Sequence, residues 1–255
     1  MKIYLAGSIS NESFKILENK HNKYLLQTFY DLRKMKDDKI EKLLNCCDEF
    51  LLDSGAFTFM NSGKKVDWKQ YIDDYCDFVN KWDIKQFIEL DLDHVVGVEY
   101  TIRIRKYIEQ RTGKKPIPVF HRIRGMKYFR EMCQEYPYIA IAASGIVKGI
   151  DEYVKNADLL KQLLRIAHSY GTKVHGLAYT RLANINNITV PFDSVDSTAW
   201  LSGARSGTIY EIRNGQIKQR KSKRRMSESE INKINLDVWL KIQEERSKED
   251  VIWIK

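Results

Sequence analysis

The chain has 255 residues, 43% of them hydrophobic, and a net charge of +9 at neutral pH. This length suits one large domain or two small ones with a sizeable buried core. The mean hydropathy is negative and no apolar run approaches membrane-spanning length, which argues against a membrane partner. The apolar part of the first seven residues is too short for a signal peptide and instead predicts a first strand.

The cysteines and histidines are spaced in a way that argues against a zinc site. Cys46, Cys47, Cys76 and Cys133 form no CxxC pair, and the five histidines contain no HxH or HxxxH pair. Scattered cysteines of this kind are typical of reduced core residues, so we expect a cytoplasmic protein.

Short β-rich apolar runs alternate along the chain with longer segments of helical periodicity. The predicted strands are Ile3–Ala6, Phe50–Asp53, Phe87–Asp91, Ile117–His121, Tyr138–Ala143, Lys173–Gly176 and Ser194–Asp196. The predicted helices are one or two within Phe14–Leu44, followed by Trp68–Trp82, Ile102–Gln110, Met126–Glu135 and Glu152–Tyr170. Gly113 and Gly171 lie where helix-ending glycines belong.

This alternation predicts a parallel sheet, and its rhythm favours a (β/α)8 TIM-type barrel with an irregular last unit. A doubly wound sheet is the alternative. We expect the barrel to occupy residues 1–207 and an appendage packed on it to occupy residues 208–255.

The appendage is predicted to be a basic hairpin followed by a helix. Asn214-Gly215 suits a type I′ turn between two short strands, and residues 231–246 have the pattern of an amphipathic helix. Between them lies a run of positive charge that favours a polyanionic partner: Lys218, Arg220, Lys221, Lys223, Arg224 and Arg225.

Polar or glycine-bearing segments follow five of the apolar runs. Because the ends of parallel strands converge at one edge of a barrel, these residues are candidates for a common site. They are Asp53, the alternating pair Asp91 and Asp93, Ser144-Gly145, His175-Gly176, and Asp193 with Asp196; His121 ends another strand.

Separated carboxylates in a polar pocket suit reactions at a glycosidic bond. One carboxylate attacks the anomeric carbon while another carries protons. Spacing alone does not separate this chemistry from an aldolase-like reaction, although no lysine candidate at a strand end supports the aldolase hypothesis.

Four short motifs resemble, in the same order, those of the tRNA-guanine transglycosylase family. Asp53-Ser54-Gly55-Ala56-Phe57 resembles Asp-Ser-Gly-Gly-Phe, and Ser144-Gly145-Ile146-Val147 resembles Gly-Gly-Leu-Ala. His175-Gly176-Leu177-Ala178 resembles Met-Gly-Val-Gly, and Asp193-Ser194-Val195-Asp196-Ser197 resembles Asp-Met-Phe-Asp-Cys. The resemblance covers roughly residues 50–207.

The resemblance implies a barrel enzyme that exchanges a guanine in a nucleic acid for a 7-deazaguanine, without metal or other cofactor. Asp196 is similar to the nucleophile that forms a covalent glycosyl-enzyme, with Asp193 as the alternative, and Asp53 to the general acid/base. The implied base contacts are Asp91 at the purine N–H edge, Asp93 beside it, His121 in place of a glutamine, the backbone of Ser144 and Gly145, and a pocket wall of Phe57, His175 and Gly176.

The chain lacks the family's C-terminal Cys-x-Cys-x-x-Cys and His zinc site and is much shorter. This pattern resembles the zinc-free phage and bacterial relatives that act on DNA; if the protein is phage-encoded, we expect it in the host cytoplasm. A flipped guanine is then expected to stack on Trp200, Phe57 or Tyr179. The expected partners are DNA, or alternatively tRNA, a free 7-deazaguanine base and a second copy in a homodimer. A non-catalytic, nucleic-acid-binding barrel is the remaining alternative.

Overall fold

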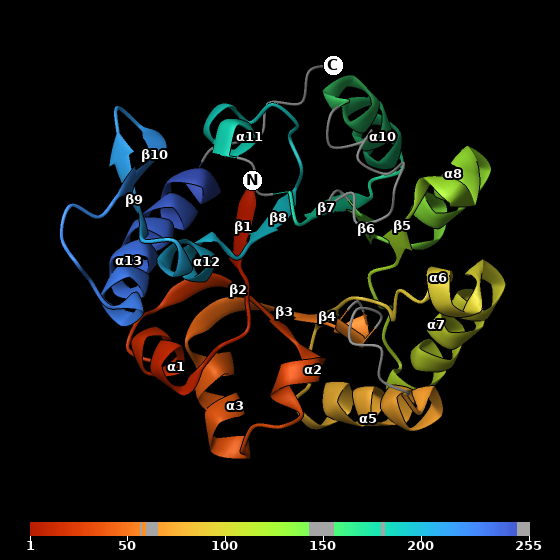
Figure 1. The fold of residues 1–255 in the computed structure, drawn as a ribbon. Helices are drawn as coiled ribbons and strands as arrows, with labels where there is room; N and C mark the ends of the chain where they lie inside the picture. Colours follow the sequence, from red (N-terminus) through yellow and green to blue (C-terminus); the bar gives the residue numbers. More distant parts are fainter. Residues whose placement is uncertain (57, 60–65, 143–155, 180–181, 249–255) are drawn as a thin grey trace.

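The computed structural model describes residues 1–56, 58–59, 66–142, 156–179 and 182–248. Eight parallel strands form one sheet in the order β4-β3-β2-β1-β8-β7-β6-β5 (Figure 1). The strands are β1 (Lys2–Leu5), β2 (Asn22–Thr28), β3 (Cys47–Asp53), β4 (Gln86–Phe87), β5 (Val119–Phe120), β6 (Tyr138–Ala142), β7 (Lys173–Leu177) and β8 (Ser194–Ser197). A single parallel bridge between Ile88 and Ile117 joins the two edges of the sheet. The sheet therefore curls round as a TIM-type barrel, as the sequence predicts.

Helices pack around the outside of this sheet (Figure 1). They are α1 (Asn11–Leu17), α2 (Phe29–Leu32), α3 (Asp37–Asn45), α5 (Trp68–Lys81), α6 (Asp93–Val96), α7 (Val98–Thr112), α8 (Gly125–Glu135), α10 (Ala157–Ser169), α11 (Leu182–Asn187), α12 (Ala199–Arg205) and α13 (Glu228–Lys248). Among the described residues, no helix combines the length and apolar character needed to cross a membrane.

Alternating side chains of the strands build two separate cores. Tyr4, Leu51 and Ala140 belong to a cluster inside the barrel, whereas Leu5 and Leu52 belong to the larger cluster between sheet and helices. Since strand side chains alternate between the two faces, every second residue of a strand points into the barrel. This alternation decides which polar residues reach the interior.

Most of the predicted helices are confirmed, but one strand was not predicted. The region Phe14–Leu44, predicted to hold one or two helices, holds all of α2, parts of α1 and α3, and also the strand β2. Its Tyr24, Leu25 and Leu26 are all buried, as the two cores require. A strand buried on both faces shows no polar alternation and cannot be told from a buried helix by periodicity.

Two boundaries also differ near the middle of the chain. The strand predicted at Phe87–Asp91 ends at Phe87, and Asp93 begins α6 instead of continuing an alternating strand. By contrast, Gly113 and Gly171 follow helices with φ of 66° and 74°, so both helix-ending glycines are confirmed.

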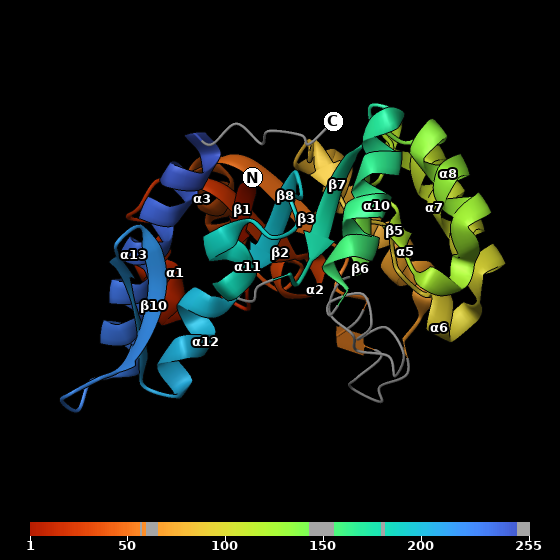
Figure 2. The same cartoon turned by 90° about the horizontal axis from the view of Figure 1, so that it is seen from above.

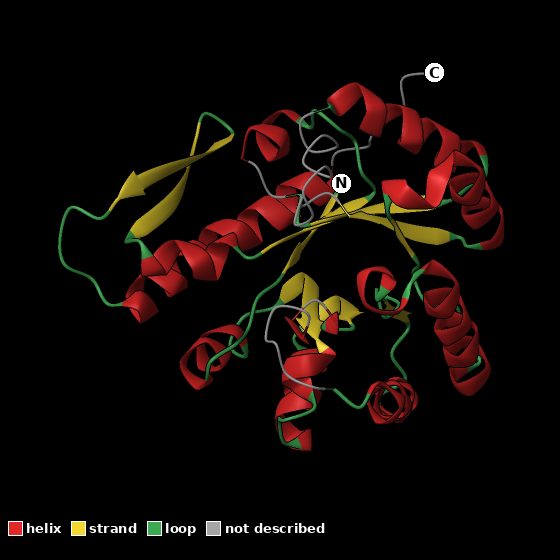
Figure 3. Cartoon of the chain, turned by 45° about the vertical axis from the view of Figure 1, so that its right-hand side comes forward, coloured by secondary structure: helices red, strands yellow, loops and turns green. Residues whose placement is uncertain are grey.

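The C-terminal hairpin is confirmed. Strands β9 (Thr208–Arg213) and β10 (Gln216–Lys221) pair antiparallel, and Asn214 and Gly215 have φ of 51° and 70°, as a type I′ turn requires. The hairpin projects from the side of the barrel (Figure 3).

The last helix, α13, belongs to the barrel's own core. Trp239 is fully buried, and the Gln243 amide donates to the backbone oxygens of Ile3 and Tyr24 at 2.8 and 2.6 Å. The helix therefore covers the outer face of β1 and β2 after the hairpin has interrupted the barrel.

Candidate active site

Asp53 ends β3 at the carboxyl rim of the barrel. The turn after it depends on Gly55, which has φ of 71° and whose added Cβ would lie 2.6 Å from the Tyr30 Cβ. The Gly55 N–H donates to Asp53 Oδ2 at 3.0 Å. Burial raises the pKa of Asp53 to about 6, and the negative charges of Asp196 and Asp91 add to this rise. Asp53 can therefore both donate and accept a proton near neutral pH.

Asp196 lies on β8, and one of its oxygens is firmly held. Oδ1 accepts a hydrogen bond from the Ala178 N–H at 2.7 Å and faces Nε2 of His175 at 3.3 Å. Ala178 has φ of 53°, a left-handed conformation that is costly for a residue with a Cβ. Within the described part of the chain, Oδ2 has no hydrogen-bond partner. The carboxylate thus keeps one oxygen for a ligand.

Asp193 lies at the opposite end of β8. It accepts from the Val174 N–H at 2.7 Å and pairs with His168 at 2.9 Å. Of the two aspartates that the sequence analysis considered, only Asp196 therefore lies toward the carboxyl end of β8.

Asp91 and His121 form a second pair at the rim, with Nε2 of His121 2.7 Å from Oδ2 of Asp91. Burial alone would lower the pKa of His121, but the hydrogen bond to Asp91 and the charges of Asp91 and Asp93 outweigh it and raise the pKa. Nδ1 of His121 and Oδ1 of Asp91 are buried without a hydrogen-bond partner among the described residues.

Asp93 belongs to a buried ion-pair network that sequence reasoning missed. Arg124 binds both of its oxygens at 2.6 Å, and these two side chains are fully buried. Arg124 and Arg105 each lie 3.4 Å from Glu89, another buried carboxylate. In the sequence, the signal for this network is Arg124, which follows a strand end. Arg105 lies on α7, and local sequence patterns do not show that it meets Glu89.

Asp91, Asp93 and His121 bring possible metal-ligand atoms within 4.8 Å of one another. Arg124, however, already occupies both oxygens of Asp93 and places a positive charge there. A cation would have to displace this guanidinium, so the arrangement fits an ion-pair network better than a metal centre.

Of the remaining residues predicted to line the base pocket, some lie outside the described residues and the others point to different faces of the sheet. Phe57, Ser144 and Gly145 lie outside the described residues. His175 is fully buried inside the barrel, whereas an added Cβ on Gly176 would point at the Phe192 ring, 3.0 Å away on the outer side.

The expected stacking role of Trp200 is wrong. Its side chain is fully buried, and its indole N–H donates to the Ala6 oxygen at 3.0 Å. Tyr179 is also buried and packs against Phe192 at 4.9 Å between ring centroids.

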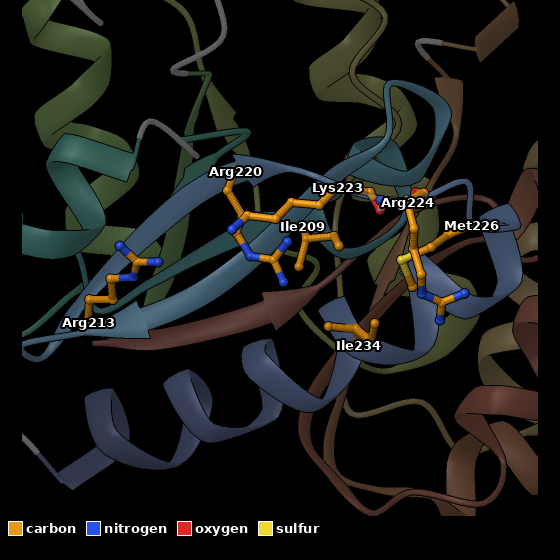
Figure 4. A pocket seen from close by; sticks show the side chains of 8 residues that line it. Ile209, Arg213, Arg220, Lys223, Arg224, Met226 and Ile234 are labelled. Carbon is orange, nitrogen blue, oxygen red and sulfur yellow. Dashed lines mark hydrogen bonds between the residues drawn. The ribbon is translucent and has the colours of Figure 1, made fainter.

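The basic run borders a pocket of about 500 Å³ between the hairpin and α13 (Figure 4). Its cationic wall and apolar floor are formed by Arg213, Arg220, Lys223, Arg224, Ile209, Met226 and Ile234, together with Ser222. Arg213, which the sequence analysis did not select, reaches this pocket because the hairpin folds its strand back beside β10.

Some of the basic residues have partners on the surface. Glu211 pairs with both Arg213 and Arg220 at 2.7 and 3.2 Å, and Arg224 pairs with Glu230 at 3.3 Å. Four cations against two carboxylates leave the pocket with an excess of positive charge. Lys218 and Lys221 are bound to neighbouring oxygens of the hairpin region, and Arg225 lies in the same exposed loop.

Neither a family model nor a curated protein matches the chain. Among solved structures, it is similar to a putative fructose-1,6-biphosphate aldolase from Coccidioides immitis, with 9% identity, a TM-score of 0.54, and coverage of 96% of this chain and 87% of that one. An enolase from Sargasso Sea environmental sequencing has 8% identity and a TM-score of 0.45; the match covers 77% of this chain and spans about half of that enolase, 54%. At such identities the likeness to the aldolase shows the barrel fold alone.

Proposed function

We propose that the chain is a base-exchange transglycosylase that replaces guanine in DNA with a 7-deazaguanine. The observation that carries this proposal is the pairing at the rim of a raised-pKa carboxyl, Asp53, with a carboxylate that keeps one oxygen free, Asp196. Double displacement at a glycosidic bond needs these two kinds of carboxyl group.

In the first half-reaction, Oδ2 of Asp196 attacks C1′ of the nucleotide. The C1′–N9 bond breaks, its electron pair goes to N9, and protonated Asp53 supplies a proton to the departing guanine. In the second half-reaction, the incoming base loses its N9 proton to Asp53 and attacks C1′, which releases the Asp196 carboxylate. Atoms and charges balance without a cofactor, and Asp53 ends protonated, as it began.

The rim supplies contacts for a planar base between these groups. Asp91 and His121 each hold a buried polar atom without a partner among the described residues, and the edge of a purine offers both donors and acceptors. A base bound there would satisfy these atoms, whose desolvation costs free energy while the pocket is empty.

The basic pocket lies within reach of the same rim. Helix α12 begins two residues after Ser197 and leads toward the hairpin; at 1.5 Å per residue its seven residues span about 10 Å, or about three base steps of a nucleic acid. Figure 2 shows the loop between β10 and α13 on the same side of the molecule as α12 and α6. Phosphates flanking a flipped nucleotide would therefore meet positive charge.

The test is release of labelled guanine from duplex DNA and from tRNA, each with a 7-deazaguanine supplied. Release from DNA supports the proposal. Release from tRNA alone would show a zinc-less tRNA enzyme instead. Binding to DNA or tRNA without guanine release from either nucleic acid would show a non-catalytic barrel.

A further inference from the structure

A line of polar side chains leads from Asp196 into the barrel interior. His175 of β7 and Ser194 of β8 face each other across the parallel register, and both are fully buried. Nδ1 of His175 is hydrogen-bonded to Oγ of Ser194, whose hydroxyl also meets that of Tyr138 on β6. Nε2 of the same imidazole faces Oδ1 of Asp196 at 3.3 Å.

For a neutral imidazole, the chemistry of these groups determines where their protons lie. An ionised Asp196 can only accept, so Nε2 of His175 must carry a proton toward it. Burial raises the pKa of Tyr138 well above its ordinary range, so this hydroxyl keeps its proton and can donate to Ser194. Ser194 then gives its single proton to Nδ1. One neutral imidazole tautomer thus satisfies every member of the line.

Serine, histidine and aspartate also make up hydrolase triads, but this arrangement is different. In a triad the serine contacts Nε2 and the aspartate contacts Nδ1. Here the two nitrogens are exchanged, and Ser194 is sealed from solvent, so no substrate reaches it. Asp196 is the end of the line nearest the rim, where 8% of its surface is accessible, and the other groups hold it in place.

We propose that His175 is a positioning residue for Asp196 and that Ser194 and Tyr138 hold its imidazole in the Nε2–H tautomer. Together with the Ala178 N–H, His175 occupies Oδ1, so that Oδ2 is turned toward the sugar. The inference rests on the proposed function, because it assigns Asp196 the attacking carboxylate.

Two substitutions of His175 separate its two contacts. In His175→Gln the amide nitrogen reaches the position of Nε2 and can still donate to Asp196. In His175→Asn the shorter amide reaches only the position of Nδ1 and contacts Ser194. We expect His175→Asn to lower kcat for guanine exchange about 10- to 100-fold with little change in KM, and His175→Gln to retain most of the activity. Equal activity of wild type, His175→Asn and His175→Gln would overturn the positioning role.

Tyr138→Phe and Tyr4→Phe form a second, milder pair that preserves packing. The Tyr138 hydroxyl belongs to the line, whereas that of Tyr4 donates to Glu49 and Gln86 at 3.2 Å, outside it. We expect kcat to fall several-fold in Tyr138→Phe and to stay unchanged in Tyr4→Phe. An unchanged kcat in Tyr138→Phe would remove Tyr138 from the line.

The tautomer itself can be read without an enzyme assay. In ¹⁵N-histidine protein, NMR should show His175 protonated at Nε2 and not at Nδ1, with this preference weakened in Ser194→Ala. Protonation at Nδ1 alone would refute the arrangement. The Nε2–H tautomer in a protein that exchanges no base would refute the proposed function and leave the hydrogen-bonded line intact.

Discussion

Two groups of carboxylates at the same rim are treated in opposite ways. Asp93 and Glu89 are fully buried, and guanidinium groups lie against both of them. Asp53 and Asp196 are held by backbone N–H groups instead, and the charge of Asp196 contributes to the raised pKa of Asp53. In the first group, arginines balance the negative charge, and the ion pairs maintain the structure. In the second group, no lysine or arginine of the described residues balances the carboxylates, so they can take up a proton or bind a ligand.

The largest effect should come from removing the free carboxylate. Asp196→Asn keeps the size of the side chain but removes the nucleophile, so guanine exchange should fall by at least about 10⁴-fold. Asp193→Asn is the matched control, because its carboxylate lies at the far end of β8; it should keep near-wild-type exchange in the same release assay. Substantial exchange by Asp196→Asn would contradict the nucleophile assignment.

Disrupting the ion pairs of Asp93 and Glu89 should lower the stability of the fold. Arg124→Met leaves Asp93 buried with an uncompensated charge and leaves Glu89 with Arg105 alone, and we expect a loss of about 3–5 kcal/mol in the free energy of unfolding by urea. Arg111→Met breaks exposed pairs with Asp73 and Asp77, which solvent screens, so its loss of stability should be much smaller. Similar losses in the two variants would remove the distinction between buried and exposed pairs.

Asp53 should link stability to pH in the opposite sense from an ordinary salt-bridged aspartate. Its pKa is raised from 3.8 to about 6, so the folded state binds more protons than the unfolded state between these values. Stability should therefore fall as pH rises from about 4 to about 6, by up to about 3 kcal/mol.

Asp53→Asn tests this linkage, because an amide oxygen can still accept from the Gly55 N–H. Urea titrations at several pH values should show a variant that is more stable than wild type at pH 7 and equal to it near pH 4. Exchange should drop about 10²- to 10⁴-fold through loss of the proton carrier. A variant that is less stable than wild type at pH 7 would contradict the raised pKa.

The smallest effect is expected from the surface charges. Reversal of Lys223 and Arg224 to glutamate should weaken DNA binding and lower the slope of log K against log salt by about 2, since each contact releases about one counterion. Fluorescence anisotropy at several salt concentrations measures this slope. Lys127→Glu with Lys161→Glu changes net charge equally on the opposite side of the barrel, and an equal loss there would indicate general attraction and not a defined basic surface.

The sequence predicted the barrel and most of the polar residues at its strand ends, because the alternation of apolar runs with helical periodicity depends on local pattern. Asp53, His121 and Asp196 could be selected in this way, since each follows its own strand. The strand β2 escaped, because burial on both of its faces erases the polar alternation that marks a strand.

What only the tertiary structure decided is which of these residues meet. The line from His175 to Tyr138 depends on strand register and on which face each side chain takes, whereas the network of Glu89, Arg105 and Arg124 depends on how α7 and the segment after β5 pack around Glu89. A one-residue difference in register moves a side chain to the other face, and no local pattern carries that information. Composition and periodicity thus determined the barrel and its polar rim, while the register of β6, β7 and β8 decided which groups hold Asp196, and the packing of Arg105 and Arg124 against Glu89 and Asp93 decided which carboxylates have their charge compensated.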